Sequence, residues 1–201
     1  MHTEVTLRSC LGSLSRVAYS GVVTRLVDFD AYSATSTPRL LFDEGPRLYG
    51  QRYTPINGPK AIYGAEGADL AEAEFAGKGI SAVRPTRGAT RIQLHLEVTL
   101  QAVLDLGDPR VRRQVATSLE ELRGPWRGVL DLTGVMPPTW ALGNAVYESE
   151  RFEAIRYPSA QVERRYCLVI FTEHLAKGSS IRAVGQSQDL ETIAGSFILK
   201  P

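Results

Sequence analysis

Cysteine is scarce in this sequence, which has only Cys10 and Cys167 among its 201 residues. Two cysteines are too few for the disulfide scaffold that stabilises many small secreted domains. A reducing compartment, the cytoplasm, is therefore the expected location. Cys167 lies in the apolar segment 166–171, which is typical of a buried strand, so we expect a structural role for this thiol.

An excess of charge of either sign is also missing, because 23 Lys and Arg residues face 22 Asp and Glu residues and leave a net charge of +1. Such a balance supplies no broad electrostatic field for nucleic-acid phosphates or anionic lipid. No apolar run is long enough to cross a bilayer, and the first twenty residues lack a secretion signal. We expect a soluble protein with no direct nucleic-acid partner and no membrane partner.

Metal-ligand spacing is a further absence. His2, His95 and His174 stand at no spacing to one another, or to either cysteine, that is typical of a metal site. His95 falls on the polar side of an alternating segment, where a solvated strand residue is expected. We therefore predict no metal.

The length and the hydrophobic content of 43% favour a single α/β or α+β domain. We place it at residues 22–201, with residues 1–21 as an N-terminal extension. The clearest element is segment 92–100, whose strict alternation of apolar and polar residues predicts a strand with one buried face. Further predicted strands are 22–28, 61–63, 166–171, 181–184 and 196–199, predicted helices are 69–76, 111–122 and 139–148, and predicted connections rich in turn residues are 45–59 and 125–138.

A carboxylate lies on the inward side of the predicted helix 69–76. At about 100° per residue, Glu74 shares a side with Leu70, whereas Glu72 points away from it. An unpaired carboxylate away from water is costly, so an inward Glu74 needs an arginine, a hydroxyl or a ligand as its partner. Arg52 and Ser159 are the candidates, and a purely structural Glu–Arg pair is the alternative.

Two other segments carry polar groups suited to a charged dinucleotide. Arg52 and Tyr53 lie in the breaker-rich segment 45–59, and the planar guanidinium of an arginine can bind a pyrophosphate through two parallel hydrogen bonds. Tyr53 and Tyr63 could stack on a base or nicotinamide ring, or be ordinary core residues. Ser159 follows a proline at the end of a predicted strand, where a serine is often only a turn residue.

The order of these motifs resembles the RES-domain family, which is named for its Arg, Glu and Ser. The family pattern is G-x-R-[WY], then a tyrosine followed eleven positions later by a glutamate, and finally P-S-A before an apolar strand. This chain has Gly50-Gln51-Arg52-Tyr53, then Tyr63 with Glu74, and Pro158-Ser159-Ala160. The likeness covers residues 22–174 most firmly and includes Arg25, where the family often has an early arginine, and Leu142-Gly143. The chain departs from the family at three places. Thr54 stands where many members have asparagine, Glu153-Ala154 where a glycine is common, and Tyr147 near a frequent tryptophan.

This resemblance implies an α+β fold similar to ADP-ribosyltransferase toxins, with a split β-sheet and flanking helices around a NAD cleft. It implies the toxin of a bacterial toxin-antitoxin pair, whose partner is an Xre-like helix-turn-helix antitoxin, and it leaves a homodimer open. NAD⁺ is then a substrate, and no cofactor is permanently bound.

The implied reaction is cleavage of the nicotinamide–ribose bond of NAD⁺, which would deplete cellular NAD. By resemblance, Glu74, Arg52 and Ser159 are the catalytic residues, and the residues that bind NAD⁺ are Arg25, Arg52, Tyr53, Tyr63 and Ser159. The acceptor stays open among water, phosphate and a protein side chain, which correspond to a glycohydrolase, a phosphorylase and an ADP-ribosyltransferase. A non-catalytic module that binds a nucleotide or an antitoxin is the alternative.

Overall fold

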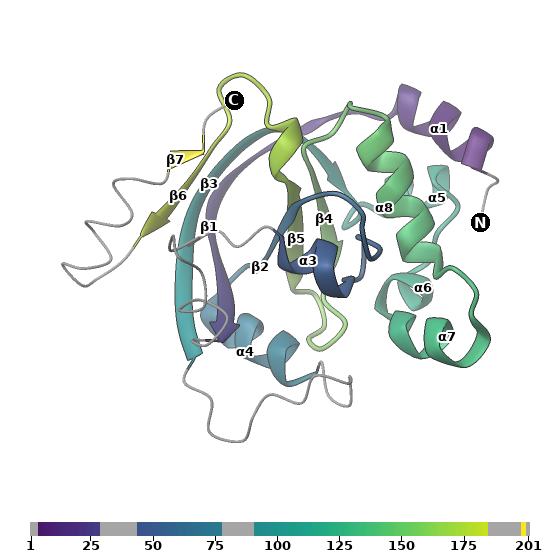
Figure 1. The fold of residues 1–201 in the computed structure, drawn as a ribbon. Helices are drawn as coiled ribbons and strands as arrows, with labels where there is room; N and C mark the ends of the chain where they lie inside the picture. Colours follow the sequence, from purple (N-terminus) through teal and green to yellow (C-terminus); the bar gives the residue numbers. More distant parts are fainter. Residues whose placement is uncertain (1–3, 29–43, 78–90, 185–197, 200–201) are drawn as a thin grey trace.

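The computed structural model describes residues 4–28, 44–77, 91–184 and 198–199 (Figure 1). The described strands are β1 Val17–Asp28, β2 Ala61–Ala65, β3 Arg91–Asp105, β4 Ala154–Pro158, β5 Tyr166–Phe171, β6 Ser180–Val184 and β7 Ile198–Leu199. The described helices are α1 Glu4–Ser13, α3 Gly45–Tyr49, α4 Ala68–Ala76, α5 Pro109–Gln114, α6 Leu119–Arg123, α7 Trp126–Thr133 and α8 Pro138–Glu148, with a short 3-10 turn η1 at Thr172–His174. The mixed α+β class predicted from the sequence is confirmed.

The strands form one sheet in the order β1-β2-β5-β4-β3-β6-β7, and β1 also pairs with β3. The extended antiparallel pairing of β1 with β3, flanked by β6, makes one part of the sheet, and β2, β5 and β4 make the other. The two parts meet where Thr24 of β1 pairs with Ala65 of β2 and where the end of β3 runs parallel to β4. A likeness of this arrangement to ADP-ribosyltransferases stays a prediction.

Two apolar cores follow from the alternation of side chains along the strands. In β3 the predicted inward residues Leu94, Leu96, Val98 and Leu100 are buried, and Ile92 is partly buried against them. They pack against one face of β5, through Leu168 and Ile170, in a core between the two parts of the sheet. The other face of β5, which includes the buried Cys167, belongs to a second core with the helices.

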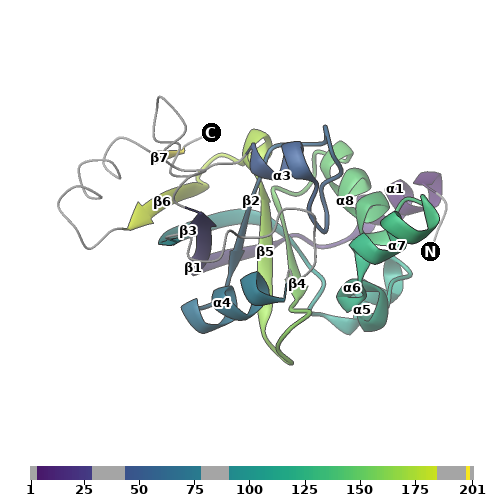
Figure 2. The same ribbon diagram turned by 60° about the horizontal axis from the view of Figure 1, so that its bottom comes forward.

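The helical side of the molecule covers the part of the sheet that carries β2, β5 and β4 (Figures 1 and 2). The predicted helix 139–148 is confirmed as α8, and its Trp140, Leu142 and Val146 are buried. The domain boundary expected at residue 22 falls inside β1, which begins at Val17. In addition, Leu7 and Leu11 of α1 are buried in the same core as α8. Leu7, Leu11 and Leu14 therefore belong to the core of the domain.

Two sequence predictions are wrong on this side. The single helix expected over 111–122 is two short helices, because Ser118 caps the N-terminus of α6 and Ala116 has a positive φ of 50°. Ser118 and Glu121 form a capping box that starts a new helix. Helix α7 also lies within segment 125–138, where a turn-rich connection was expected.

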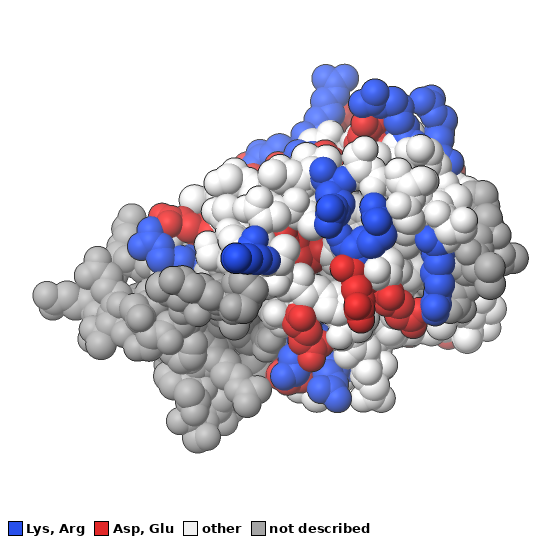
Figure 3. Space-filling view, turned by 90° about the horizontal axis from the view of Figure 1, so that it is seen from above, with Lys and Arg blue, Asp and Glu red and all other residues white. Residues whose placement is uncertain are grey.

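Within the part of the chain that the structure describes, no helix is both long enough and apolar enough to cross a membrane. Seen from above, Lys and Arg side chains lie beside Asp and Glu side chains over the described surface (Figure 3). This mixture is what the near balance of charges in the sequence predicts.

Candidate active site

Arg52 and Tyr53 are the two central residues of a tight turn between α3 and β2. Gly50 ends α3 with a positive φ of 67°, which a glycine adopts without strain. The turn is closed by paired backbone hydrogen bonds between Gln51 and Thr54, with N–O distances of 2.8 and 3.1 Å. The Trp140 indole Nε1 donates to the Gln51 carbonyl at 2.7 Å, so α8 holds the turn from outside.

Tyr63 of β2 also holds this turn, through its hydroxyl group. Its hydroxyl oxygen accepts a hydrogen bond from the Tyr53 backbone N–H at 2.9 Å and lies 3.1 Å from the Thr54 Oγ1. Burial raises the pKa of Tyr63 well above its ordinary value, so the phenol stays neutral. The Tyr63 hydroxyl is therefore hydrogen-bonded to the loop that carries Arg52, and the expected contact of Tyr63 with NAD⁺ stays a prediction.

Glu74 faces inward from α4, as predicted, and meets the segment that follows β4. Its Oε1 accepts a hydrogen bond from the Ser159 hydroxyl and a second one, at 3.0 Å, from the Ala160 backbone N–H. Glu72 of the same helix is exposed. The expected hydroxyl partner is thus the one that the structure brings to this carboxylate.

Ser159 is completely buried. Its oxygen accepts hydrogen bonds from the backbone N–H groups of Gln161 and Val162, each at 3.0 Å. A hydroxyl has one proton and two lone pairs, so the only proton of Ser159 is committed to Glu74. Ser159 is therefore placed to orient Glu74, and its expected contact with the substrate stays a prediction.

Arg52 is anchored to the C-terminal end of α6. Its Nη1 donates to the carbonyl oxygens of Leu122 and Gly124, at 2.7 and 2.9 Å. Among the described residues Arg52 and Glu74 form no ion pair, so the alternative of a structural Glu–Arg pair is wrong.

Tyr53 is a core residue. None of its surface is exposed, and its ring packs against the Tyr157 ring with centroids 4.7 Å apart. Burial raises the pKa of Tyr53, an effect that the Arg52 charge opposes and the Glu74 charge reinforces. The expected stacking of Tyr53 on a nicotinamide or adenine ring is corrected by this burial, since a ring inside the core cannot stack on a ligand.

Tyr157 is the residue at this site that sequence reasoning missed. It is nearly buried, and burial raises its pKa well above the ordinary value, with Glu74 and Tyr63 among the nearby groups that contribute. It stands immediately before the Pro158-Ser159-Ala160 segment, and this position was the available signal.

Arg25 lies in β1 opposite Leu94 of β3, one residue beyond the contact of β1 with β2. It is partly buried, and α4 packs against both β1 and β2. Arg25 is thus on a strand next to the helix of Glu74, and its role as a pyrophosphate ligand stays a prediction. Among the described residues no group of three or more His, Cys, Asp and Glu side chains could hold a metal ion.

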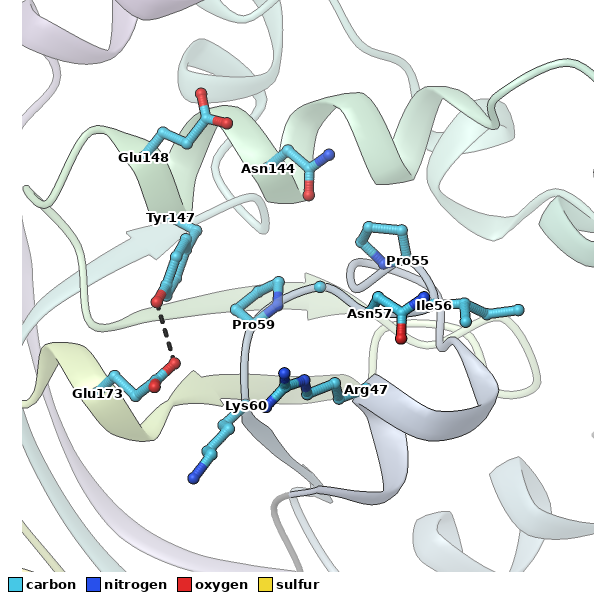
Figure 4. A pocket seen from close by; sticks show the side chains of 11 residues that line it. Arg47, Pro55, Ile56, Asn57, Pro59, Lys60, Asn144, Tyr147, Glu148 and Glu173 are labelled. Atoms are coloured by element: carbon cyan, nitrogen blue, oxygen red, sulfur yellow. Dashed lines mark hydrogen bonds between the residues drawn. The ribbon is translucent and has the colours of Figure 1, made fainter.

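A hollow of about 490 Å³ lies beside the residues that precede β2 (Figure 4). Asn57 and Asn144 face it from the loop after α3 and from α8, and the Tyr147 hydroxyl donates to Glu173 at 3.0 Å on one side. None of the residues expected to bind NAD⁺ lines it. The hollow is therefore distinct from the group around Glu74.

The family model described as RES domain matches residues 23–192 of this chain. Among solved structures, a chain in the crystal structure of the M. tuberculosis MbcT-MbcA toxin-antitoxin complex is similar to it, with a TM-score of 0.64 and 21% sequence identity. The alignment covers 96% of this chain and 98% of that chain. No curated protein matches.

Proposed function

This chain belongs to the RES domain family, and from that premise we propose that it cleaves the nicotinamide–ribose bond of NAD⁺ as the toxin of a toxin-antitoxin pair. The observation that carries the proposal is the Glu74 carboxylate, held on one oxygen by Ser159 and Ala160. An inward carboxylate oriented by two donors suits a cationic sugar centre, and an arginine on an anchored turn suits a pyrophosphate.

Glu74 has the central role in the proposed reaction. As the bond to the neutral nicotinamide leaving group breaks, positive charge grows on the ribose, and a fixed carboxylate stabilises that charge. Both described hydrogen bonds of Glu74 go to Oε1. Oε2 has no hydrogen bond to the residues that the structure describes, so it is the oxygen we assign to the ribose.

Ser159 positions Glu74 rather than reacting itself. Its proton is given to Glu74, and its lone pairs are taken by two backbone N–H groups. It therefore has no donor for the ribose and cannot serve as a nucleophile without losing this network. Its contribution is the orientation of the carboxylate, an effect to which catalytic rates are sensitive.

Arg52 is proposed to bind the pyrophosphate. Its Nη1 is occupied by the two α6 carbonyls, and these bonds fix the direction of the planar guanidinium. The described residues make no hydrogen bond to Nε or Nη2, which leaves these donors for phosphate oxygens. Tyr63 acts indirectly, because its hydroxyl holds the turn from which Arg52 projects.

Nicotinamide release from NAD⁺ tests the reaction. Purified protein should release nicotinamide, and Glu74→Gln should abolish release while the fold is kept, because a glutamine oxygen still accepts from Ser159 and Ala160. Glu72→Gln, on the exposed side of α4, is the matched control and should keep full activity. An active and folded Glu74→Gln variant would refute the role assigned to this residue.

The acceptor is identified in the same assay. Release that needs inorganic phosphate and gives ADP-ribose phosphorylated on the ribose indicates a phosphorylase, and release in its absence that gives free ADP-ribose indicates a glycohydrolase. Transfer of label from NAD⁺ to protein indicates an ADP-ribosyltransferase. Tight binding of NAD⁺ without release or transfer would favour a non-catalytic module.

The proposed partner is an Xre-like helix-turn-helix antitoxin. Support comes from the similar fold of a chain in the MbcT-MbcA toxin-antitoxin complex. Expression of the chain alone should arrest cell growth, and co-expression with a helix-turn-helix protein encoded by a neighbouring gene should restore it. Unrelieved arrest by an active chain, without formation of a complex, would refute this partner.

A further inference from the structure

We infer that Arg165 is a positioning residue that joins the loop of Ser159 to helix α4 and so fixes the Glu74 carboxylate, an inference that rests on the proposed function. Residues 159–165 connect β4 to β5 and lie beside α4 in both ribbon views (Figures 1 and 2). The loop contacts the helix near both ends, and Arg165 makes the contact at the N-terminal end.

At that end the Arg165 guanidinium binds a carboxylate and a backbone carbonyl together. Nη1 donates to the Asp69 Oδ2 at 2.9 Å, and Nη2 donates to the Asp69 Oδ1 at 3.0 Å and to the Glu66 carbonyl at 2.8 Å. The two parallel bonds to one carboxylate fix the orientation of the side chain. The Arg165 hydrogen bonds also hold the pKa of Asp69 below its ordinary value, so the pair stays charged near neutral pH.

Gly67 is what lets the guanidinium come this close. It precedes α4 with a φ of +125°, and a Cβ at this position would lie 2.7 Å from the Arg165 Nη2. Any other residue would meet both backbone strain and this side chain. The start of α4 is therefore shaped to receive Arg165.

The same residue closes the loop that carries Ser159. The Arg165 carbonyl accepts the Ser159 backbone N–H at 2.8 Å. Ser159 and Ala160 then donate to Glu74, which stands one and a half turns along α4 from Asp69. A Cβ on Gly77, just after the helix, would overlap the Gln161 side chain, so the loop also reaches the C-terminal end of α4. Arg165 thus links both partners of the Ser159–Glu74 hydrogen bond.

The contacts of Arg165 with Asp69, Glu66 and Ser159 affect the position of the Glu74 carboxylate more than the stability of the protein. The side chain of Asp69 is 73% exposed and that of Arg165 is 36% exposed, and ion pairs at that exposure add little to stability. A carboxylate that must meet a ribose centre is sensitive to displacements of about 1 Å, which can cost roughly a hundredfold in rate. Arg165 therefore acts on turnover through Ser159 and Glu74.

The test begins with Arg165→Met and Asp69→Asn in the nicotinamide-release assay. We expect each to lower kcat about tenfold with KM for NAD⁺ within about twofold, because the change removes orientation and not substrate contacts. Arg165→Lys should recover part of the loss, since an ammonium can reach Asp69 but cannot form the parallel pair. Arg182→Met is the matched control, because Arg182 makes an exposed pair with Glu97 on β3, away from this site, and it should keep full activity.

A double-mutant cycle separates positioning from a general structural effect. If Arg165 acts through Ser159, adding Arg165→Met to Ser159→Ala should lower kcat little beyond Ser159→Ala alone. If the fold-losses in kcat of the two single variants multiply in the double variant, or if Arg165→Met leaves kcat unchanged, this inference is overturned while the proposed function stands. A wild-type protein without release or transfer would instead refute the enzyme itself, and the inference with it.

Discussion

Replacement of Ser159 by alanine removes three hydrogen bonds at once. The hydroxyl donates to Glu74 and accepts from the backbone N–H groups of Gln161 and Val162. Because Ser159 is completely buried, water cannot take its place without opening the loop. The substitution therefore acts on both the stability of the fold and the orientation of the carboxylate.

Both effects can be estimated from these bonds. A buried donor that loses its acceptor costs about 1–3 kcal/mol, and Gln161 is exposed enough for water to satisfy part of the loss. We expect a loss of stability of about 2 kcal/mol. For turnover, Glu74 keeps the Ala160 N–H but loses a charge-assisted bond worth about 1.5–3 kcal/mol. If most of that bond orients the transition state, kcat falls about tenfold to a hundredfold.

Ser179→Ala is the matched control for this prediction. Ser179 is equally buried, and its hydroxyl donates to the Glu153 carboxylate at 2.9 Å and accepts from the Gln101 N–H at 3.2 Å. Both variants should lose comparable stability in chemical denaturation, but only Ser159→Ala should lose kcat for nicotinamide release, with KM little changed. An equal loss of kcat in both variants, or none in Ser159→Ala, would refute the orienting role.

The remaining predictions concern packing and pH. Gly143→Ala should destabilise the protein by about 3 kcal/mol in denaturant titration, because its Cβ would overlap the Tyr53 carbonyl oxygen, whereas Gly128→Ala in α7, whose nearest neighbour lies at 3.7 Å, should be tolerated. Tolerance of both changes would contradict the close approach of α8 to the Arg52 turn. The protein should also lose stability above about pH 10, because the folded state raises the pKa of Tyr19 to about 12 and the unfolded chain ionises first at its ordinary value of 10.0. Part of the tyrosinate absorbance should appear only together with loss of circular dichroism, because Tyr53, Tyr63 and Tyr157 are among the tyrosines whose pKa is raised by burial. Ionisation of all eight tyrosines with an unchanged circular dichroism spectrum would contradict their burial.

The strands were predictable because burial of one or both faces leaves a pattern in sequence. The alternation in 92–100 predicted β3, and the apolar run 166–171 predicted β5, which the structure buries on both faces. The ends were less predictable, since β3 extends to Asp105 and β1 begins at Val17. The extra length of β1 follows from its pairing with β3, and the end of β3 pairs with β4, which no local pattern records.

The predictions for the helices in 111–122 and 125–138 were wrong for a different reason. Segment 111–122 has apolar residues at helical spacing, but the local capping box at Ser118 starts a new helix within it. Helix α7 did leave a pattern, because Trp126, Val129 and Leu130 stand at helical spacing. The breakers around it, Pro125, Gly134 and Pro137, are what made the segment resemble a connection.

The residues that carry the family resemblance differ in what they touch, and a motif alone cannot reveal this. Glu74 and Arg52 each have polar atoms without a described hydrogen-bond partner. In contrast, the Ser159 hydroxyl is hydrogen-bonded to Glu74, and the Tyr63 hydroxyl is hydrogen-bonded to the turn that carries Arg52. Tyr53 contributes its backbone to that turn while its ring fills the core. The pattern therefore combines two groups suited to a substrate with the groups that hold them in place. It follows that loss of a holding residue should lower turnover in proportion to the displacement it allows, whereas loss of the Glu74 charge should abolish turnover even when nothing moves.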